Sequence, residues 1–276
     1  MDKFINNPTV SIIMATYNAE KTIGDSIRSV IAQTYKDWEL IVVDDCSQDS
    51  TASVVKAIAG DAAAADIAER RAGESGPRII LHSNDKNRGV SGARNIGVGL
   101  ARGEWIAVLD SDDLWREDKL DKQMRFIKET GADISYTATS YIDPDGNVSG
   151  YVLHAEKEFT YKGLLGRNLM SCSSVIVRKG LILHTLFPEG ESELHEDYAS
   201  WLPILREVKC AYGLDEPLLL YRLSKSSKTG SRVRSGMMTF NTYRHIGYGY
   251  VSAALLTMRY AVHSISKRAM IKLMMR

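Results

Sequence analysis

Three carboxylates, Asp110, Asp112 and Asp113, follow directly after a hydrophobic run in the segment WIAVLDSDDLW. Carboxylates this close repel one another, so they need a cation or a strongly polar site. Oxygen ligands of this kind suit Mg²⁺ or Mn²⁺, ions that usually keep several waters and bind substrate phosphates. The alternative is a solvated acidic turn that caps the next helix, and the D-x-D spacing alone leaves both interpretations open.

A second acidic pair, Asp44 and Asp45, ends the hydrophobic segment WELIVV. A carboxylate at the end of a strand can accept a hydrogen bond from a ribose hydroxyl or from a base N–H. The alternative role is local, because Ser47 or Asp49 is well placed to cap a following helix.

Two further segments carry groups that could contact an anion or accept a proton. Residues 87–95 hold Arg88 and Arg94 between an expected strand and an expected helix, where guanidinium groups and a helix N-terminus can face an anion. The segment LHED places Glu196 and Asp197 before another expected helix. An isolated acidic pair is often only a helix cap, and the neighbouring His195 is a possible metal ligand.

Alternating strands and helices are expected to position these groups. Hydrophobic runs predict strands at 10–15, 38–43, 79–82 and 105–109, and apolar periodicity predicts helices near 23–31, 50–72 and 91–101. This alternation predicts an α/β fold with a right-handed, mostly parallel sheet. Ligands of such sheets bind at the carboxyl ends of the strands, where the acidic pairs lie.

The order of elements is less regular after residue 113. The sequence predicts a helix around 120–127, strands at 134–138, 174–177 and 217–223, and a turn at 143–146. A helix is expected after Asp197, although Pro203 should kink or interrupt it. The compact domain is therefore predicted to cover residues 1–222.

The charge of the chain is divided unevenly. The 276 residues carry 35 Lys+Arg and 34 Asp+Glu, a net charge of +1. Residues 222–276 contain 11 of the basic side chains and no acidic one, so residues 1–221 have a net charge of −10. The overall composition excludes a disordered chain, a collagen-like fibre and a protein with many membrane spans. The asymmetry predicts a basic arm at residues 223–276.

Apolar and basic residues alternate within this arm, as in segments that lie in a membrane interface. The alternative is that its apolar residues pack on the compact domain or on a second subunit. Nucleic-acid binding is a weaker interpretation because no known reader module accompanies the charge. The longest uncharged stretch of the arm, 245–258, has 14 residues, fewer than the roughly 17–25 that span a bilayer.

Targeting and redox signals are also informative. The N-terminal segment has no signal-peptide pattern. The cysteines Cys46, Cys172 and Cys210 show neither metal spacing nor a disulfide framework, which indicates a reducing compartment. A cytoplasmic protein, peripheral on the inner face of the cell membrane, is therefore expected.

In order and spacing, three segments resemble the inverting glycosyltransferases of family 2. They are VSIIMATYNAEKTIGDSIRSVIAQTYKDWELIVVDDCSQDST, NRGVSGARNIGVGLARGEWIAVLDSDD and HEDYASW. The resemblance covers about residues 8–222 and implies the GT-A fold. In that fold, about 1–113 would form the Rossmann-like nucleotide-sugar half and 114–222 the acceptor half, followed here by a helical basic arm.

The resemblance also implies roles for particular residues on the donor side. Thr16, Tyr17 and Asn18 match the first-strand loop that packs on the nucleotide. Asp45 matches the acid that reads the uracil and ribose region, and Arg88 or Arg94 would lie near the phosphates. The D-x-D motif is formed by Asp110, Ser111 and Asp112: Asp112 would ligate Mg²⁺ or Mn²⁺ directly, while Asp110 would face the ribose or the waters of the metal.

On the acceptor side, Asp197 matches the general base of the family, and Glu196 would orient the acceptor or the base. The resemblance implies transfer of a sugar from a nucleotide sugar, expected to be a UDP-sugar, to a hydroxyl of a glycan or of a lipid-linked diphosphate glycan. Bacterial surface polysaccharides such as capsule or O-antigen are the expected products. Arg222, Lys225 and Lys228 follow the last strand and either close over the diphosphate or form a solvated loop.

Departures from the family pattern limit these expectations. Ala15 stands where relatives often carry a hydroxyl or a proline, and no Q-x-x-R-W motif follows Asp197. The absence of that motif and of a membrane span favours addition of one sugar per encounter. Two other functions compete: a sugar nucleotidyltransferase, whose Gly-rich phosphate loop is missing here, and a catalytically silent family member that acts as a binding subunit.

Overall fold

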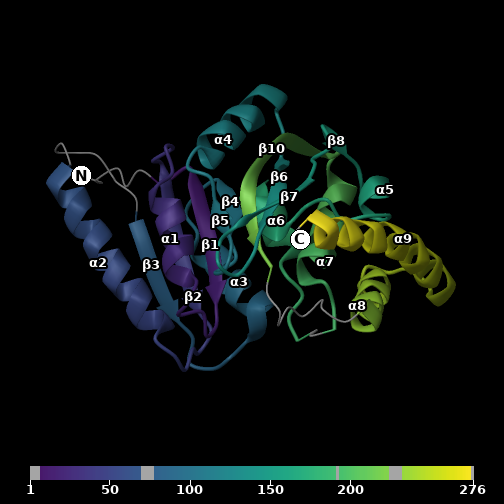
Figure 1. Cartoon of the computed structure of the whole chain (residues 1–276), viewed down its shortest axis with the longest axis horizontal. Coiled ribbons are helices and arrows are strands. Elements are labelled where there is room, and N and C mark those ends of the chain that lie inside the picture. Colours follow the sequence, from purple (N-terminus) through teal and green to yellow (C-terminus); the bar gives the residue numbers. More distant parts are fainter. Residues whose placement is uncertain (1–6, 70–77, 191–192, 224–231, 275–276) are drawn as a thin grey trace.

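A computed structural model describes residues 7–69, 78–190, 193–223 and 232–274 (Figure 1). These residues form one central sheet with the strand order β3-β2-β1-β4-β9-β6-β10-β5, to which β7 adds beside β6 and β8 beside β10. The predicted α/β class with a mostly parallel sheet is confirmed.

The first half of the chain builds the parallel part of the sheet. Strands β1 (Val10–Thr16), β2 (Trp38–Asp44), β3 (Arg78–Ser83) and β4 (Trp105–Val108) run parallel. Helices α1 (Ile23–Ile31) and α2 (Thr51–Glu69) cover one face, and α3 (Gly89–Leu100) covers the other. Strands β1, β2 and β4 are buried on both faces and are mostly hydrophobic, as the sequence indicated, whereas the edge strand β3 is partly exposed.

The second half continues the sheet with mixed directions. Strand β9 (Ile176–Arg178) is antiparallel to both neighbours, β4 and β6 (Ile134–Ile142), whereas β10 (Ala211–Arg222) is parallel to β6. The remaining elements of this half are β5 (Leu114–Trp115), α4 (Lys119–Thr130), β7 (Val148–Leu153), β8 (Glu158–Phe159), α5 (Tyr161–Leu164), the 3₁₀ turn η1 (Cys172–Ser174), α6 (Lys179–Thr185) and α7 (Glu196–Glu207).

Several predicted boundaries are wrong, each for a local reason. The strand expected from Ser174 starts at Ile176, because η1 occupies 172–174. Helix α7 is not interrupted at Pro203: it continues to Glu207, since the buried Trp201 and Ile204 hold it in the core. Tertiary packing here outweighs the lost hydrogen bond of proline.

The last strand is much longer than predicted. Strand β10 begins at Ala211, six residues before the expected start at Pro217. Its register against β6 shifts on either side of Pro217, and such irregularities accommodate a residue that lacks a ladder donor.

The basic arm folds as two helices, α8 (Arg232–His245) and α9 (Tyr250–Met274), at one end of the molecule (Figure 1). Tyr243 of α8 and Ala253 of α9 are buried in the same hydrophobic cluster as residues of the central sheet. The Tyr243 hydroxyl donates to the backbone oxygen of Leu165 at 2.6 Å. The inner faces of both helices therefore belong to the core. Within the described ranges, no helix is long and apolar enough to cross a membrane.

Candidate active site

The carboxyl ends of β1, β2 and β4 meet at a cleft of about 1960 Å³ that extends to the start of α7 and to α9. Every predicted site residue except Arg88 lines it: Thr16, Tyr17, Asn18, Asp45, Arg94, Asp110, Ser111, Asp112, Glu196 and Asp197. Parallel strands bring segments that are far apart in the sequence to one edge, and ligands bind there in open α/β sheets.

The loop after β1 is held in shape by the loop after β2. Asn18 has a positive φ of 51°, and its side-chain oxygen accepts a hydrogen bond from the backbone N–H of Gln48 at 2.8 Å. Its own N–H donates to the Ser47 hydroxyl at 2.9 Å. Tyr17, next to it, is about half exposed at the cleft. Asn18 thus shapes the loop that presents Tyr17.

Asp45, directly after β2, is buried and is fixed in one orientation. Its Oδ1 accepts hydrogen bonds from Asn84 Nδ2 and from the backbone N–H of Arg88, both at 2.8 Å. Arg88 therefore supports Asp45 through its main chain, and its side chain does not line the cleft. Sequence reasoning missed Asn84, although a polar residue directly after β3 is the same signal that identified Asp45.

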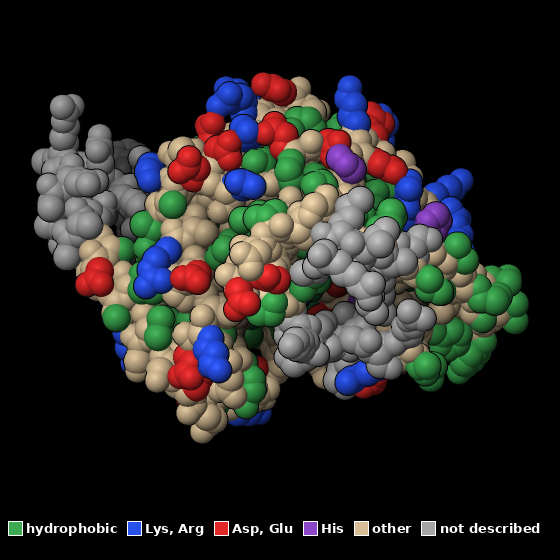
Figure 2. Space-filling model, viewed as in Figure 1, with side chains coloured by type: hydrophobic (Ala, Val, Ile, Leu, Met, Phe, Trp, Pro, Cys, Tyr) green, Lys and Arg blue, Asp and Glu red, His purple; other side chains and the backbone are tan. Residues whose placement is uncertain are grey.

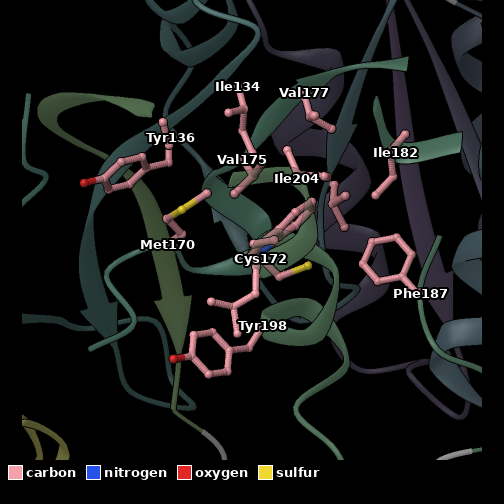
Figure 3. Packing of buried hydrophobic residues seen from close by; sticks show 14 of the residues in the cluster. Ile134, Tyr136, Met170, Cys172, Val175, Val177, Ile182, Phe187, Tyr198 and Ile204 are labelled. Carbon is pink, nitrogen blue, oxygen red and sulfur yellow. The ribbon is translucent and has the colours of Figure 1, made fainter. Parts of the chain in front are cut away.

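The D-x-D segment faces a buried arginine. Arg94 Nη2 donates to Asp110 Oδ1 at 2.5 Å, and the guanidinium lies 5.2 Å from the centre of the Phe187 ring. Cys172 and Phe187 belong to the buried hydrophobic cluster (Figure 3). Arg94 Nε is buried without a hydrogen-bond partner among the described residues. Arg94 also lines the cleft, so its guanidinium can act on an anion bound there as well as on Asp110.

Asp113, the third carboxylate, faces the interior. Its Oδ2 accepts a hydrogen bond from Ser173 Oγ at 2.6 Å, and its Oδ1 accepts one from the backbone N–H of Arg222 at 2.9 Å. Burial and the charges of Asp112 and Asp110 raise the pKa of Asp113 well above its usual value. Asp113 thus anchors the D-x-D turn to the buried Ser173 and to the backbone of Arg222.

The Arg222 side chain also bonds this turn. Its Nε donates to the backbone oxygen of Asp112 and its Nη1 to that of Pro144, both at 2.9 Å. Arg222 lines the cleft. Its closure over a diphosphate stays a prediction. Lys225 and Lys228, its predicted partners, lie outside the described residues.

Asp112 has the environment expected of a cation ligand. Burial and the neighbouring Asp110 raise the pKa of Asp112 to about 6, and a bound cation would relieve this repulsion. In the described part of the chain, no three His, Cys, Asp or Glu residues form a ready-made metal cage. Mg²⁺ and similar ions usually bind through one or two carboxylates plus substrate phosphates, and Asp110 and Asp112 are two carboxylates that line the cleft.

Glu196 and Asp197 occupy the first turn of α7. Burial and the charge of Glu196 raise the pKa of Asp197, and a higher pKa improves a carboxylate as a proton acceptor. His195 Nε2 lies 3.2 Å from the backbone oxygen of Ser235 in α8. The His195 ring is therefore engaged by the arm, and the His195 side chain makes no cap bond to α7.

Residues 11–178 match the family model for glycosyl transferase family 2, more than half of the chain. The chain belongs to glycosyltransferase family 2. This family 2 enzyme is 31% identical over 262 residues to the putative teichuronic acid biosynthesis glycosyltransferase TuaG of Bacillus subtilis, covering 95% of this chain and 98% of that one. It is 34% identical over 230 residues to WfgD of Escherichia coli, a UDP-Glc:α-D-GlcNAc-diphosphoundecaprenol β-1,3-glucosyltransferase, covering 82% and 81% of the two chains.

Solved structures share the fold of this glycosyltransferase. Residues 1–349 of Staphylococcus aureus TarS in complex with UDP-GlcNAc superpose with a TM-score of 0.68 at 20% identity, covering 90% of this chain and 70% of that one. The mannosyltransferase PcManGT of Pyrobaculum calidifontis, in complex with GDP-Man and Mn²⁺, gives a TM-score of 0.64 at 18% identity, with 96% and 76% covered. The expected GT-A fold is confirmed.

Proposed function

We propose that this glycosyltransferase inverts the anomeric centre and transfers one sugar per encounter from a UDP-sugar to a hydroxyl of a lipid-linked diphosphate glycan. The observation that carries the proposal is the presence of two acidic sets, Asp110–Asp112 and Glu196–Asp197, in one cleft with Arg94. Arg94 is bonded to Asp110 and is close enough to Glu196 for the two charges to interact.

The donor side of the cleft has to stabilise a leaving nucleoside diphosphate. Asp112 and Asp110 would hold Mg²⁺ or Mn²⁺, which when bound neutralises the charge that develops on the leaving phosphate. Arg94 holds Asp110 in place and lines the cleft, so its guanidinium can also contact the leaving phosphate. Donors already oriented toward developing charge stabilise a transition state without reorganisation.

The acceptor side has to remove a proton from the attacking hydroxyl. Asp197 is positioned for this task because Tyr198 N–H donates to its Oδ1 at 2.7 Å and fixes the carboxylate. A general base typically contributes about 10²–10⁴-fold to the rate. If the hydroxyl attacks from the side opposite the leaving phosphate, a single displacement inverts the anomeric configuration.

The names of two relatives support the substrate class and the pathway. WfgD is described as transferring glucose from UDP-Glc to a GlcNAc-diphospholipid, and TuaG is a putative teichuronic acid biosynthesis enzyme. We therefore propose a role in bacterial surface polysaccharide synthesis, such as capsule or O-antigen. The neighbours that contain UDP-GlcNAc and Mn²⁺ support a UDP-sugar and a divalent cation.

We also propose that the arm docks on the cytoplasmic membrane surface. Figure 2 shows hydrophobic side chains gathered at the end of the molecule formed by α8 and α9. The exposed ones include Val233, Met237, Tyr250 and Val251. Residues 222–276 carry 11 basic and no acidic side chains, so anionic lipid headgroups are the partner of complementary charge. A lipid-linked acceptor would be met at the same surface.

The test is Asp197→Asn, with Asp61→Asn on the exposed surface of α2 as the matched control. UDP-glucose, Mn²⁺ and a GlcNAc-diphosphate with a short alkyl chain are the probes. The Asp197 variant should bind UDP-glucose normally by calorimetry but lose at least about 100-fold in kcat, the lower limit for a general base. Near-normal turnover would rule out Asp197 as the base. If no sugar is transferred from any of a panel of UDP-sugars, the proposed function is wrong.

A further inference from the structure

The inner side of α9 forms part of the cleft wall near the acidic pair. Tyr260, His263, Ser264 and Met270 of α9 line the same cleft as Glu196 and Asp197, together with Ser235 and Met238 of α8. The arm therefore contributes directly to the space in which the acceptor would be bound.

The opposite side of α9 is apolar and exposed. Val251, Leu255, Met258, Val262 and Ile265 follow one another at spacings of four and three residues and are 54–75% exposed. Residues at this spacing lie on one face of a helix. Helix α9 thus has two surfaces of different kind: an inner one that meets the cleft and an outer apolar one.

Hydrogen bonds hold the arm in a defined position relative to the base. His195, two residues before Asp197, donates its backbone N–H to Thr242 Oγ1 of α8 at 3.2 Å. The hydroxyls of Tyr243 of α8 and Tyr198 of α7 are hydrogen-bonded to each other at 3.0 Å. These bonds link α8 to the first residues of α7, so the wall and the base are parts of one structure.

Helix α9 itself packs closely on the acceptor half. The Arg259 guanidinium lies so close to Gly166 that a Cβ atom there would come within 2.8 Å of Arg259 Nε. The ring of Tyr260 lies 5.5 Å, between centroids, from that of Tyr198. Both contacts fix the rotation of α9 about its axis, and this rotation decides which residues face the cleft.

We propose that α9 forms one wall of the acceptor site and that the acceptor is bound between its inner face and Asp197. The proposal rests on the proposed function and adds the location and chemistry of the acceptor subsite. The aromatic and apolar lining, Tyr151, Leu153, Tyr260 and Met270, suits the C–H face of a sugar ring and the first carbons of a lipid. Arg167 and His263 supply N–H donors for a phosphate group.

This arrangement connects the two surfaces of α9. A lipid-linked substrate has its sugar-diphosphate in water and its chain in the membrane. With the outer apolar face of α9 on the membrane, the inner face would stand directly above the lipid headgroups, where the diphosphate emerges. One helix would then position both the enzyme on the membrane and the acceptor at the base.

The test is Ser264→Trp, which fills the cleft from α9, with Ser252→Trp as the matched control. Ser252 lies on the same helix, is exposed and does not line the cleft. With UDP-glucose, Mn²⁺ and the short-chain, water-soluble GlcNAc-diphosphate, Ser264→Trp should lower kcat/KM for the acceptor at least about tenfold, while the KM for UDP-glucose and its slow hydrolysis without acceptor stay unchanged. Ser252→Trp should match the wild type in every assay.

The milder variant His263→Ala removes an exposed ring and should raise the acceptor KM about threefold without affecting donor hydrolysis. Retained hydrolysis shows that a variant is folded, so a loss confined to the acceptor cannot come from unfolding. An unchanged acceptor KM in both α9 variants, in protein that transfers sugar, overturns the inference and leaves the proposed function intact. A wild-type protein that neither hydrolyses nor transfers from any UDP-sugar overturns both.

Discussion

Replacing Ser173 by alanine should show how much the D-x-D turn depends on a hydroxyl from another part of the chain. Ser173 is buried, and its Oγ makes two hydrogen bonds: it donates to Asp113 Oδ2 at 2.6 Å and accepts from the backbone N–H of Asp110 at 3.0 Å. Alanine removes both bonds and leaves a buried carboxylate and a backbone N–H without this partner.

The expected cost follows from these two bonds. The raised pKa of Asp113 favours its neutral form, and a hydrogen bond between neutral groups is worth about 0.5–1.5 kcal/mol, so losing both bonds in Ser173→Ala should lower the free energy of unfolding by about 1–3 kcal/mol. The pKa of Asp113 should rise further, because the lost bond favoured its charged form. Since Asp110 would also lose a restraint, the affinity for UDP with Mn²⁺ should fall about tenfold, or about 1.4 kcal/mol.

Ser174→Ala is the matched control. Ser174 is equally buried in the same turn, but its Oγ donates only to the backbone oxygen of Ser171, at 2.7 Å. Its loss should cost about 1 kcal/mol of stability and leave UDP binding unchanged. Urea denaturation and calorimetry measure the two quantities. If the two variants lose equal stability and both bind UDP with wild-type affinity, the anchoring role assigned to Ser173 and Asp113 is refuted.

Two further predictions concern the cation and the membrane. Because the pKa of Asp112 is raised to about 6, protons should compete with Mn²⁺ below that pH, weakening its binding by about tenfold per pH unit; calorimetry from pH 5 to pH 8 checks this. Between about pH 4 and pH 6, Asp112 keeps its proton in the metal-free fold but has released it in the unfolded chain. The contribution of Asp112 to the free energy of unfolding should therefore fall as pH rises through this window. Thermal unfolding without Mn²⁺ should show this fall in stability, and added Mn²⁺ should reverse it. The double variant Leu255→Glu/Val262→Glu should lose binding to phosphatidylglycerol vesicles and keep turnover of the short-chain acceptor. Vesicle binding that survives the double substitution would contradict membrane docking. A wild-type dimer that the double variant dissociates would instead show that a second copy covers this face.

Local sequence patterns were sufficient for the parallel half of the sheet. Predominantly apolar runs at β1, β2 and β4 are typical of strands buried on both faces, and their positions agree with the structure within one or two residues. The polar residues that follow them, Asp45 and Asp110 among others, then necessarily share one edge of the sheet. This is why most candidate residues of the donor side could be named in advance.

Patterns failed where a contact between distant segments outweighs local preference. Pro203 predicts a break in α7, yet the buried face of that helix keeps it continuous. Asn84 and Ser173 hold Asp45 and Asp113 across separations of 39 and 60 residues. The position of Asn84 directly after β3 marks it as a site candidate, but the sequence does not show which residue it or Ser173 contacts. Such partners become visible only when the chain is folded.

The sequence by itself determined the class of fold, the family and the acidic residues at the strand ends, because these depend on hydrophobic runs and on residue types in a fixed order. Only the tertiary structure decided that Asp113 faces inward, that Arg94 pairs with Asp110, and that α9 turns one face to the cleft. The physical reason is the same in each case. These roles depend on which remote surface covers a side chain, and packing, not local order, sets that.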